Sequence, residues 1–234
     1  PKKVFMENVL EFRLKKFIRK FNLKKMSKKY LLLAILISTT SFSQEYFEGI
    51  LKFKIQIKDK TGQMSEDQAK HFIGTEQTYY LKGNQYKSIY NGLLEMTGYH
   101  NGKDTLFMKM KGGNELTYSL TSTEEEKVIS YEFKKTNLIL LGYKCELLIV
   151  RTDKGFHKYY FNRKIKLNPE DYRNHKAGLW HFFLEKTGGA ISLKTSGDLF
   201  DSNNSIEVIS IERKKLDNSV FKKPNLPIVK MQEQ

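Results

Sequence analysis

Leu51-Lys52-Phe53-Lys54-Ile55-Gln56-Ile57-Lys58, residues 51–58, is the stretch that decides the fold. Its apolar and polar side chains alternate, which is the period of a β-strand with one buried and one solvated face. Similar short runs recur from residue 47 onward, and turn signals such as Lys82-Gly83-Asn84-Gln85 and His100-Asn101-Gly102-Lys103-Asp104 separate them. We therefore predict about nine strands at close spacing, mostly joined as antiparallel hairpins. Leu138–Val150 is almost wholly apolar and predicts a central strand.

Two stretches depart from this alternation and predict short helices. Ser65 with Gln68 three residues later matches a capping box. A second helix-compatible stretch begins at Asn168-Pro169 and continues to Leu184. The chain is thus predicted to be α+β, mainly β, with a single curved antiparallel sheet and one or two short helices.

The first 43 residues differ from the rest in charge and composition. They carry 11 of the 41 basic and 2 of the 26 acidic side chains, so the formal charge of +15 falls to +6 over the remainder. A cationic start at residues 26–29, an apolar run at residues 30–37 and small residues at Ser41 and Ser43 follow the order of a secretory signal peptide. We predict cleavage after Ser43. The apolar run is shorter than the about 20 residues of a membrane-spanning helix, so we predict no permanent transmembrane anchor.

These features divide the chain into three segments. Residues 1–25 are predicted to be a non-native or upstream-translated leader, because a signal peptide begins at its own cationic region. The alternative is a basic amphipathic tail that lies on a membrane surface. Residues 26–43 are the predicted signal peptide and residues 44–234 a single β-rich domain. We expect a protein that is exported to the periplasm, the outer membrane or the medium, and that does not bind nucleic acid.

Motifs that carry chemistry are scarce. The only cysteine, Cys145, excludes a disulfide framework and a multi-Cys zinc site. The five histidines form no HExxH pattern. We therefore predict no catalytic residue, no metal ligand and no cofactor, and we expect a protein that is not an enzyme. A metal site around His175 and His181, and a hydrolase that uses His157, His175 and His181 with the acidic residues near them, remain the alternatives.

Aromatic side chains recur on successive predicted strands. A curved sheet lined by such residues can close on a helix and leave an apolar cleft for a hydrophobic small molecule or lipid. The alternative is that the same side chains fill an ordinary core, and both interpretations stay open. The candidate ligand contacts are Tyr80, Tyr86, Tyr90, Phe107, Tyr118, Tyr131, Phe133, Tyr143, Tyr160 and Trp180.

An ordered set of short motifs points to a group of families. The motifs are Ser41–Gln44, Leu141–Cys145, Tyr159–Phe161, Lys166–Glu170, Gly178–Trp180, Thr187–Leu193 and Val220–Pro224. Together they resemble the Bacteroidota envelope families of unknown function that are related to the GLPGLI family. The resemblance implies an exported β-rich domain with a curved sheet akin to lipoprotein-carrier folds, and no known catalytic residues.

Two functions follow as hypotheses. The first is an envelope protein that binds a hydrophobic ligand or lipid in the concave face of its sheet. The alternative is a non-enzymatic interaction or assembly module that recognises an outer-membrane or periplasmic protein through a sheet edge or face.

Overall fold

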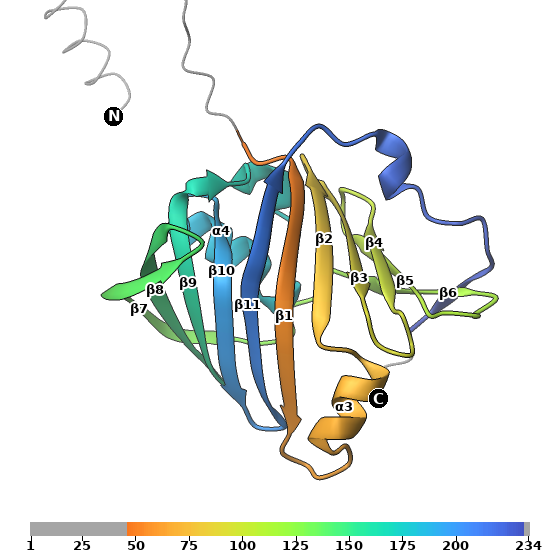
Figure 1. The fold of residues 1–234 in the computed structure, drawn as a ribbon, viewed down its shortest axis with the longest axis horizontal. Coiled ribbons are helices and arrows are strands. Elements are labelled where there is room, and N and C mark those ends of the chain that lie inside the picture. The colour runs from red at the N-terminus through yellow and green to blue at the C-terminus, as the bar shows by residue number, and fades with distance from the viewer. Residues whose placement is uncertain (1–45, 232–234) are drawn as a thin grey trace, which may run out of the picture. The chain divides into compact units, whose positions relative to one another are not determined.

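β1 (Gly49–Asp59) lies in the middle of one large sheet (Figure 1). The structure is a computed structural model that describes residues 46–231, so the predicted leader, the signal peptide and the cleavage site after Ser43 lie outside the described residues. In β1 the predicted alternation is observed. Leu51, Phe53 and Ile55 are buried, and Lys52 and Lys54 between them are exposed.

Twelve strands join the sheet in the order β12-β6-β5-β4-β3-β2-β1-β11-β10-β9-β8-β7. One half comprises β2 (Glu76–Lys82), β3 (Gln85–Tyr90), β4 (Thr97–His100), β5 (Thr105–Lys109), β6 (Leu116–Leu120) and β12 (Ile228–Lys230). The other half comprises β7 (Val128–Leu140), β8 (Tyr143–Thr152), β9 (Gly155–Lys166), β10 (Ala190–Leu199) and β11 (Ser202–Arg213). β12 pairs with β6 in parallel, and the other pairings are antiparallel.

The two halves meet through β1. It pairs with β2 on one side and with β11 on the other, where Gly49 lies opposite Arg213 and Asp59 opposite Ser202. The remaining long strands are joined to their sequence neighbours as hairpins, except where a helical segment intervenes between β9 and β10. Apart from β12, whose pairing with β6 is also long-range, the sheet is therefore two local meanders linked by the pairing of β1 with β11.

The predicted central strand at Leu138–Val150 is wrong. The chain turns at Leu141 and Gly142, which have φ angles of 48° and 81°, and β8 returns beside β7 at the edge of the sheet. Two consecutive residues with positive φ are typical of the tight turns that join hairpin strands. The apolar run concealed this turn, because apolar residues continue on both sides of Gly142.

The helical segments lie where the sequence predicts them. α3 (Glu66–Phe72) begins with the predicted capping box, in which the Gln68 N–H donates to Ser65 Oγ at 3.2 Å. The second segment contains η2 (Pro169–Tyr172), η3 (Ala177–Leu179) and α4 (Trp180–Thr187). A further turn, η4 (Asn218–Phe221), lies between β11 and β12.

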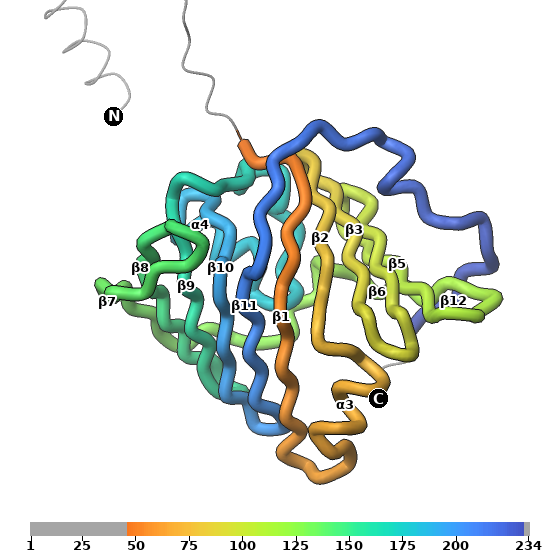
Figure 2. The backbone as a smooth tube through the Cα atoms, viewed as in Figure 1, coloured from red at the N-terminus to blue at the C-terminus, as the bar shows by residue number. Residues whose placement is uncertain are grey.

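The sheet is curved, and the segment from η2 to α4 lies inside the curve (Figures 1 and 2). Phe183 and Leu184 of α4 are buried in the same core as Phe53 of β1 and Phe161 of β9. A mainly β fold built on a single curved, mostly antiparallel sheet with short helices is thus confirmed.

Candidate functional site

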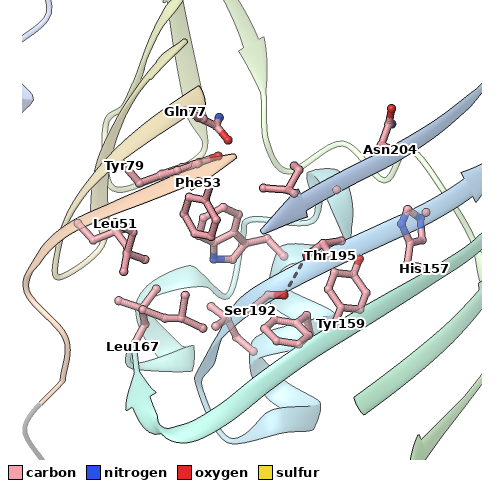
Figure 3. Close-up of a pocket in the computed structure, with 18 of the residues that line it drawn as sticks. Leu51, Phe53, Gln77, Tyr79, His157, Tyr159, Leu167, Ser192, Thr195 and Asn204 are labelled. Atoms are coloured by element: carbon pink, nitrogen blue, oxygen red, sulfur yellow. Dashed lines mark hydrogen bonds between the residues drawn. The ribbon is translucent and has the colours of Figure 1, made fainter. Parts of the chain in front are cut away.

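A cavity of about 370 Å³ lies between the concave face of the sheet and the η3–α4 segment (Figure 3). Strands β1, β2, β9, β10 and β11 contribute to its walls, together with α4. Most of its surface is formed by Leu51, Phe53, Tyr79, Leu81, Tyr159, Leu167, Trp180, Phe183, Leu184, Ile191, Leu199 and Ile206. The other lining residues are Gln77, His157, Gly178, Ser192, Thr195, Gly197 and Asn204. No Lys, Arg, Asp or Glu is among the described residues that line it.

The strand register explains why β1 and β2 supply one wall. Leu51 lies opposite Tyr79, and Phe53 lies opposite Gln77. Residues directly opposite each other in an antiparallel pair point to the same face of the sheet. The rings of Phe53 and Tyr79 meet edge to face, with centroids 5.9 Å apart. The alternation that buries the apolar face of β1 therefore also directs its side chains into the cavity.

The cavity has a polar end and an apolar end. In Figure 3, His157 and Asn204 lie on one side, and Leu51 and Leu167 lie on the other. Between them, the hydroxyl groups of Ser192 and Thr195 are 2.9 Å apart and form a hydrogen bond with each other. A molecule with one polar and one apolar end matches this distribution of side chains.

A buried carboxylate supports the polar end. Glu126 Oε2 lies 2.8 Å from His157 Nε2 and accepts a hydrogen bond from Thr152 Oγ1 at 2.9 Å. The side chain of Glu126 is only 8% exposed, and a buried charge needs such partners. Burial raises the pKa of the Tyr159 phenol, and the nearby Glu126 carboxylate raises it further. The side chain of His157, on β9, is therefore held in place by Glu126, which belongs to the loop that precedes β7.

A stack of aromatic and histidine rings adjoins the cavity behind Trp180. Tyr86 stacks on Trp180 and on His100, with ring centroids 5.2 and 4.8 Å apart. The Tyr86 hydroxyl lies 2.9 Å from His175 Nε2. Burial lowers the pKa of His175 to about 3, with a further contribution from His100, and burial also lowers the pKa of His100. Both histidines are thus neutral packing groups at ordinary pH.

The loop between β6 and β7 holds the helical segment over the cavity. The carbonyl oxygen of Thr121 accepts hydrogen bonds from the N–H groups of Lys176 and Ala177, at 2.7 and 2.9 Å. Gly178 and Leu179 then have positive φ angles of 60° and 59°, which redirect the chain into α4. Glycine adopts this conformation freely, whereas leucine rarely does. The hydrogen bonds to Thr121 and the two positive φ angles therefore fix where α4 begins, and so hold this helix over the cavity.

The predicted ligand contacts on the concave face fall into two groups. Trp180 lines the cavity, and Tyr86 and Tyr90 lie beside it, because they pair with Leu81 and Gln77 of the cavity wall. Tyr131 and Phe133 share the concave face but lie on the edge strand β7, where 47% and 45% of each residue is exposed. The rings of these two residues do not line the cavity.

The other predicted contacts lie on the opposite face. Tyr80 alternates with the cavity residues Tyr79 and Leu81, so it points away from the cavity. The register continues this outer row across the sheet, from Tyr80 through Lys87 to Tyr99 and the remaining candidates Phe107 and Tyr118. Tyr160 and Tyr143 share the outer face of β9 and β8 in the same way. As ligand contacts, all these residues remain predictions.

Apart from Trp180, the residues that line the cavity were not among the predicted contacts, and several of them are polar. Gln77, Ser192, Thr195 and Asn204 line the cavity and belong to three strands, β2, β10 and β11. The alternation of Gln77, Tyr79 and Leu81 is a signal that could have identified one of them. The Glu126–His157 contact had no sequence signal, because it joins a loop to a distant strand.

The geometry of the described residues offers little support for the hydrolase and metal-site alternatives. Within residues 46–231, no hydroxyl or thiol is hydrogen-bonded to the second ring nitrogen of His157, whereas a nucleophile would need that contact. In the same part of the chain, no three His, Cys, Asp or Glu side chains converge as metal ligands. No helix among these residues is long and apolar enough to cross a membrane.

Comparisons with known proteins leave the function open. No protein-family model and no curated protein matches the chain. Among solved structures, the chain is similar to PNGF-II in the C2 and P21 space groups, at TM-scores of 0.34 and 0.35 and identities of 14% and 12%. Each likeness covers 78% of this chain, which spans only 31% of the structure that it matches. Such low TM-scores carry no argument, so the resemblance to the GLPGLI-related families stays a prediction.

Proposed function

We propose that this chain is an exported, non-enzymatic protein of the bacterial cell envelope that binds a hydrophobic small molecule or lipid in the cavity under α4. The observation that carries the proposal is the cavity itself. Its volume of about 370 Å³ lies within the usual range of small-molecule sites. Its walls are mainly apolar, and His157 and Asn204 place polar groups at one end, as in sites that orient a ligand. The signal-peptide pattern and the resemblance to envelope families support the location.

Packing energetics favour an occupant. Protein interiors are close-packed, and few voids exceed the size of a water molecule. Each Å² of apolar surface that a ligand removes from water contributes about 25 cal/mol. Phe53, Leu167 and Ile206 offer such surface from three separate parts of the chain. An apolar ligand would therefore gain binding energy without displacing any side chain of the core.

Two neighbouring residues of β10 provide a matched test of this site. Thr195 lines the cavity, whereas Ser196 lies on the outer face of the same strand. Native mass spectrometry with organic extraction should detect a co-purified lipid or other apolar molecule on the wild-type protein and on Ser196→Phe. Thr195→Phe, which fills the cavity, should carry none. Equal loading of both variants, or a wild-type protein without any ligand, would contradict the proposal.

Export has its own test. When the full chain is expressed with its leader in a Gram-negative host, N-terminal sequencing of the exported protein should give Gln44 as the first residue. A protein that keeps residues upstream of Gln44 would contradict the predicted cleavage. This outcome would leave the binding proposal to stand on the cavity alone.

The edge strand β7 favours a second candidate, recognition of an envelope protein by strand addition. β7 is the last strand of the sheet, and its Ile129 and Ile139 are 64% and 62% exposed. A free sheet edge with exposed apolar side chains can pair with an extended segment of a partner. Ile129→Lys together with Ile139→Lys should then abolish co-purification of a periplasmic or outer-membrane partner while ligand loading is unchanged.

A further inference from the structure

The distribution of hydrogen-bonding groups in the cavity defines a ligand class. We infer that the ligand is an uncharged amphiphile whose hydroxyl groups donate hydrogen bonds to His157 and Asn204, while its apolar chain extends toward Leu51 and Leu167. This inference rests on the proposed function and names the chemistry of the molecule bound at that site.

Glu126 sets the role of His157. An ionised carboxylate can only accept hydrogen bonds, so the Nε2 that lies 2.8 Å from Glu126 carries the proton. In the neutral imidazole the other nitrogen, Nδ1, is then an acceptor. Within residues 46–231, no group is hydrogen-bonded to Nδ1. His157 therefore offers one free acceptor at the cavity wall.

Asn204 offers a second acceptor in the same cross-strand row. Its Oδ1 is buried without a hydrogen-bond partner in the described part of the chain, whereas its Nδ2 donates to Ser202 Oγ at 3.1 Å. A buried acceptor that stays unpaired costs about 1–3 kcal/mol. Two unfilled acceptors call for a ligand that donates, which favours hydroxyl groups over carbonyl or ether oxygens.

Gly197 forms the notch between these two acceptors. The register places it directly opposite His157 on one neighbouring strand and opposite Asn204 on the other. A Cβ at residue 197 would lie 3.2 Å from His157 Nδ1. Neighbouring strands lie about 4.8 Å apart, so the two flanking backbones are separated by about 10 Å. A glycine at this position leaves room for a small head group such as a diol.

The charge of the site argues against an anionic head group. No Lys or Arg is among the described cavity-lining residues, and Glu126 lies directly behind His157. A carboxylate or phosphate placed beside His157 would lose its hydration and meet a like charge. A monoacylglycerol or a fatty alcohol matches the notch better than a fatty acid or a phospholipid does.

Paired titrations test this inference on the purified, delipidated protein. Trp180 is the only tryptophan of the chain and lines the cavity, so its fluorescence reports binding there. At pH 8, where a fatty acid is ionised, 1-monodecanoylglycerol should bind at least about tenfold more tightly than decanoate, a difference of about 1.4 kcal/mol. Native mass spectrometry of the same samples should give the same order.

Variants of the notch make the test specific. Gly197→Ala and Asn204→Leu should each weaken monodecanoylglycerol binding about three- to tenfold, the range for one lost hydrogen bond. Neither variant should change decanoate binding. Ser196→Ala, on the outer face beside Gly197, should bind both amphiphiles as the wild type does, which controls for general effects on β10.

The outcomes separate the inference from the proposed function. Decanoate that binds as tightly as the glyceride would overturn the inference and leave the hydrophobic site in place. Glyceride binding that both notch variants leave unchanged would do the same. If neither amphiphile alters the Trp180 fluorescence or appears in native mass spectra, the inference and the proposed function both fail.

Discussion

His157 and His175 both lie inside the protein among aromatic rings, yet their surroundings differ. His157 is held by the Glu126 carboxylate and leaves its second nitrogen free at the cavity wall. His175 is 3% exposed, lies among Tyr86, His100 and Trp180, and has no carboxylate partner among the described residues. The carboxylate of Glu126 fixes the proton of His157 on Nε2 and leaves Nδ1 available to a ligand. Burial among neutral rings instead keeps His175 uncharged, so that it serves to pack the core.

The largest expected effect comes from removing the centre of the ring stack. Tyr86→Ala should lower the free energy of unfolding by about 3–5 kcal/mol, the range for truncating a large buried aromatic residue. Tyr86 contacts His100 and Trp180 and is 4% exposed. Tyr80→Ala, on the outer face of β2, should cost clearly less and serves as the control. Equal losses in urea unfolding experiments would contradict the assigned packing.

Acid should destabilise the fold through His175. Its pKa is about 3 in the folded protein, below its value of 6.5 without burial, so the unfolded chain binds more protons between these values. The contribution of His175 to stability should therefore be fully present above pH 6.5 and be lost progressively as pH falls toward 3. The loss from this one group between pH 6.5 and 4.5 should be about 2 kcal/mol. His100, whose pKa is also lowered by burial, changes stability in the same direction.

The pH dependence can be assigned by substitution. His175→Gln should flatten the decrease in unfolding free energy between pH 6.5 and 4.5, because Gln does not titrate. His71→Gln, at an exposed position of α3, should leave the curve unchanged. A curve that remains as steep in His175→Gln would show that another group causes the acid sensitivity.

Glu126→Gln should make the surroundings of His157 more like those of His175, because it removes the carboxylate partner. The Gln amide offers an NH2 group as well as an oxygen, and in the orientation in which the NH2 group donates to His157 Nε2 the imidazole proton lies on Nδ1, which then faces the cavity as a donor. The free energy of unfolding should fall by about 1–3 kcal/mol because charge-assisted hydrogen bonds are lost. The ligand preference should shift toward decanoate. An unchanged preference in the fluorescence titration would contradict the role given to Glu126.

Trp180→Phe should have the smallest effect. The indole Nε1 is buried without a hydrogen-bond partner in residues 46–231. Replacing the indole removes this unpaired donor, which offsets part of the packing that a smaller ring loses. We expect the free energy of unfolding to change by no more than about 1 kcal/mol. A loss above 3 kcal/mol in urea unfolding would show that the stack depends on the indole as much as on Tyr86.

The fold could be predicted from the sequence wherever alternation and turn residues agreed. β1 and the capping box of α3 are cases where local chemistry alone specifies the element. The turn at Leu141-Gly142 was missed because apolar residues surround it, and a continuous apolar run has no period that marks a reversal. The pairing of β1 with β11 was not predictable locally, since its partners lie at opposite ends of the described chain.

The site could be predicted only in kind. Aromatic residues do surround the cavity, but Tyr79 and Tyr80 are adjacent and of the same type, so alternation could not tell which of them points inward. The polar end depends on long-range register. One row across the sheet contains His157, Gly197 and Asn204, because β9, β10 and β11 pair side by side there. No local sequence pattern predicts that pairing.

The pairing of β1 with β11 also bears on the order in which the protein folds. The two meanders are joined only when the strand that contains residue 49 pairs with the strand that contains residue 213. Such long-range pairings slow folding, because the chain between the two strands must first close into a loop. We expect each meander to collapse early and their union through β1 to be the slow step. A chain truncated before residue 202 should then fail to fold cooperatively. Until residues 202–213 have been made, the two meanders can collapse separately but cannot join through β1.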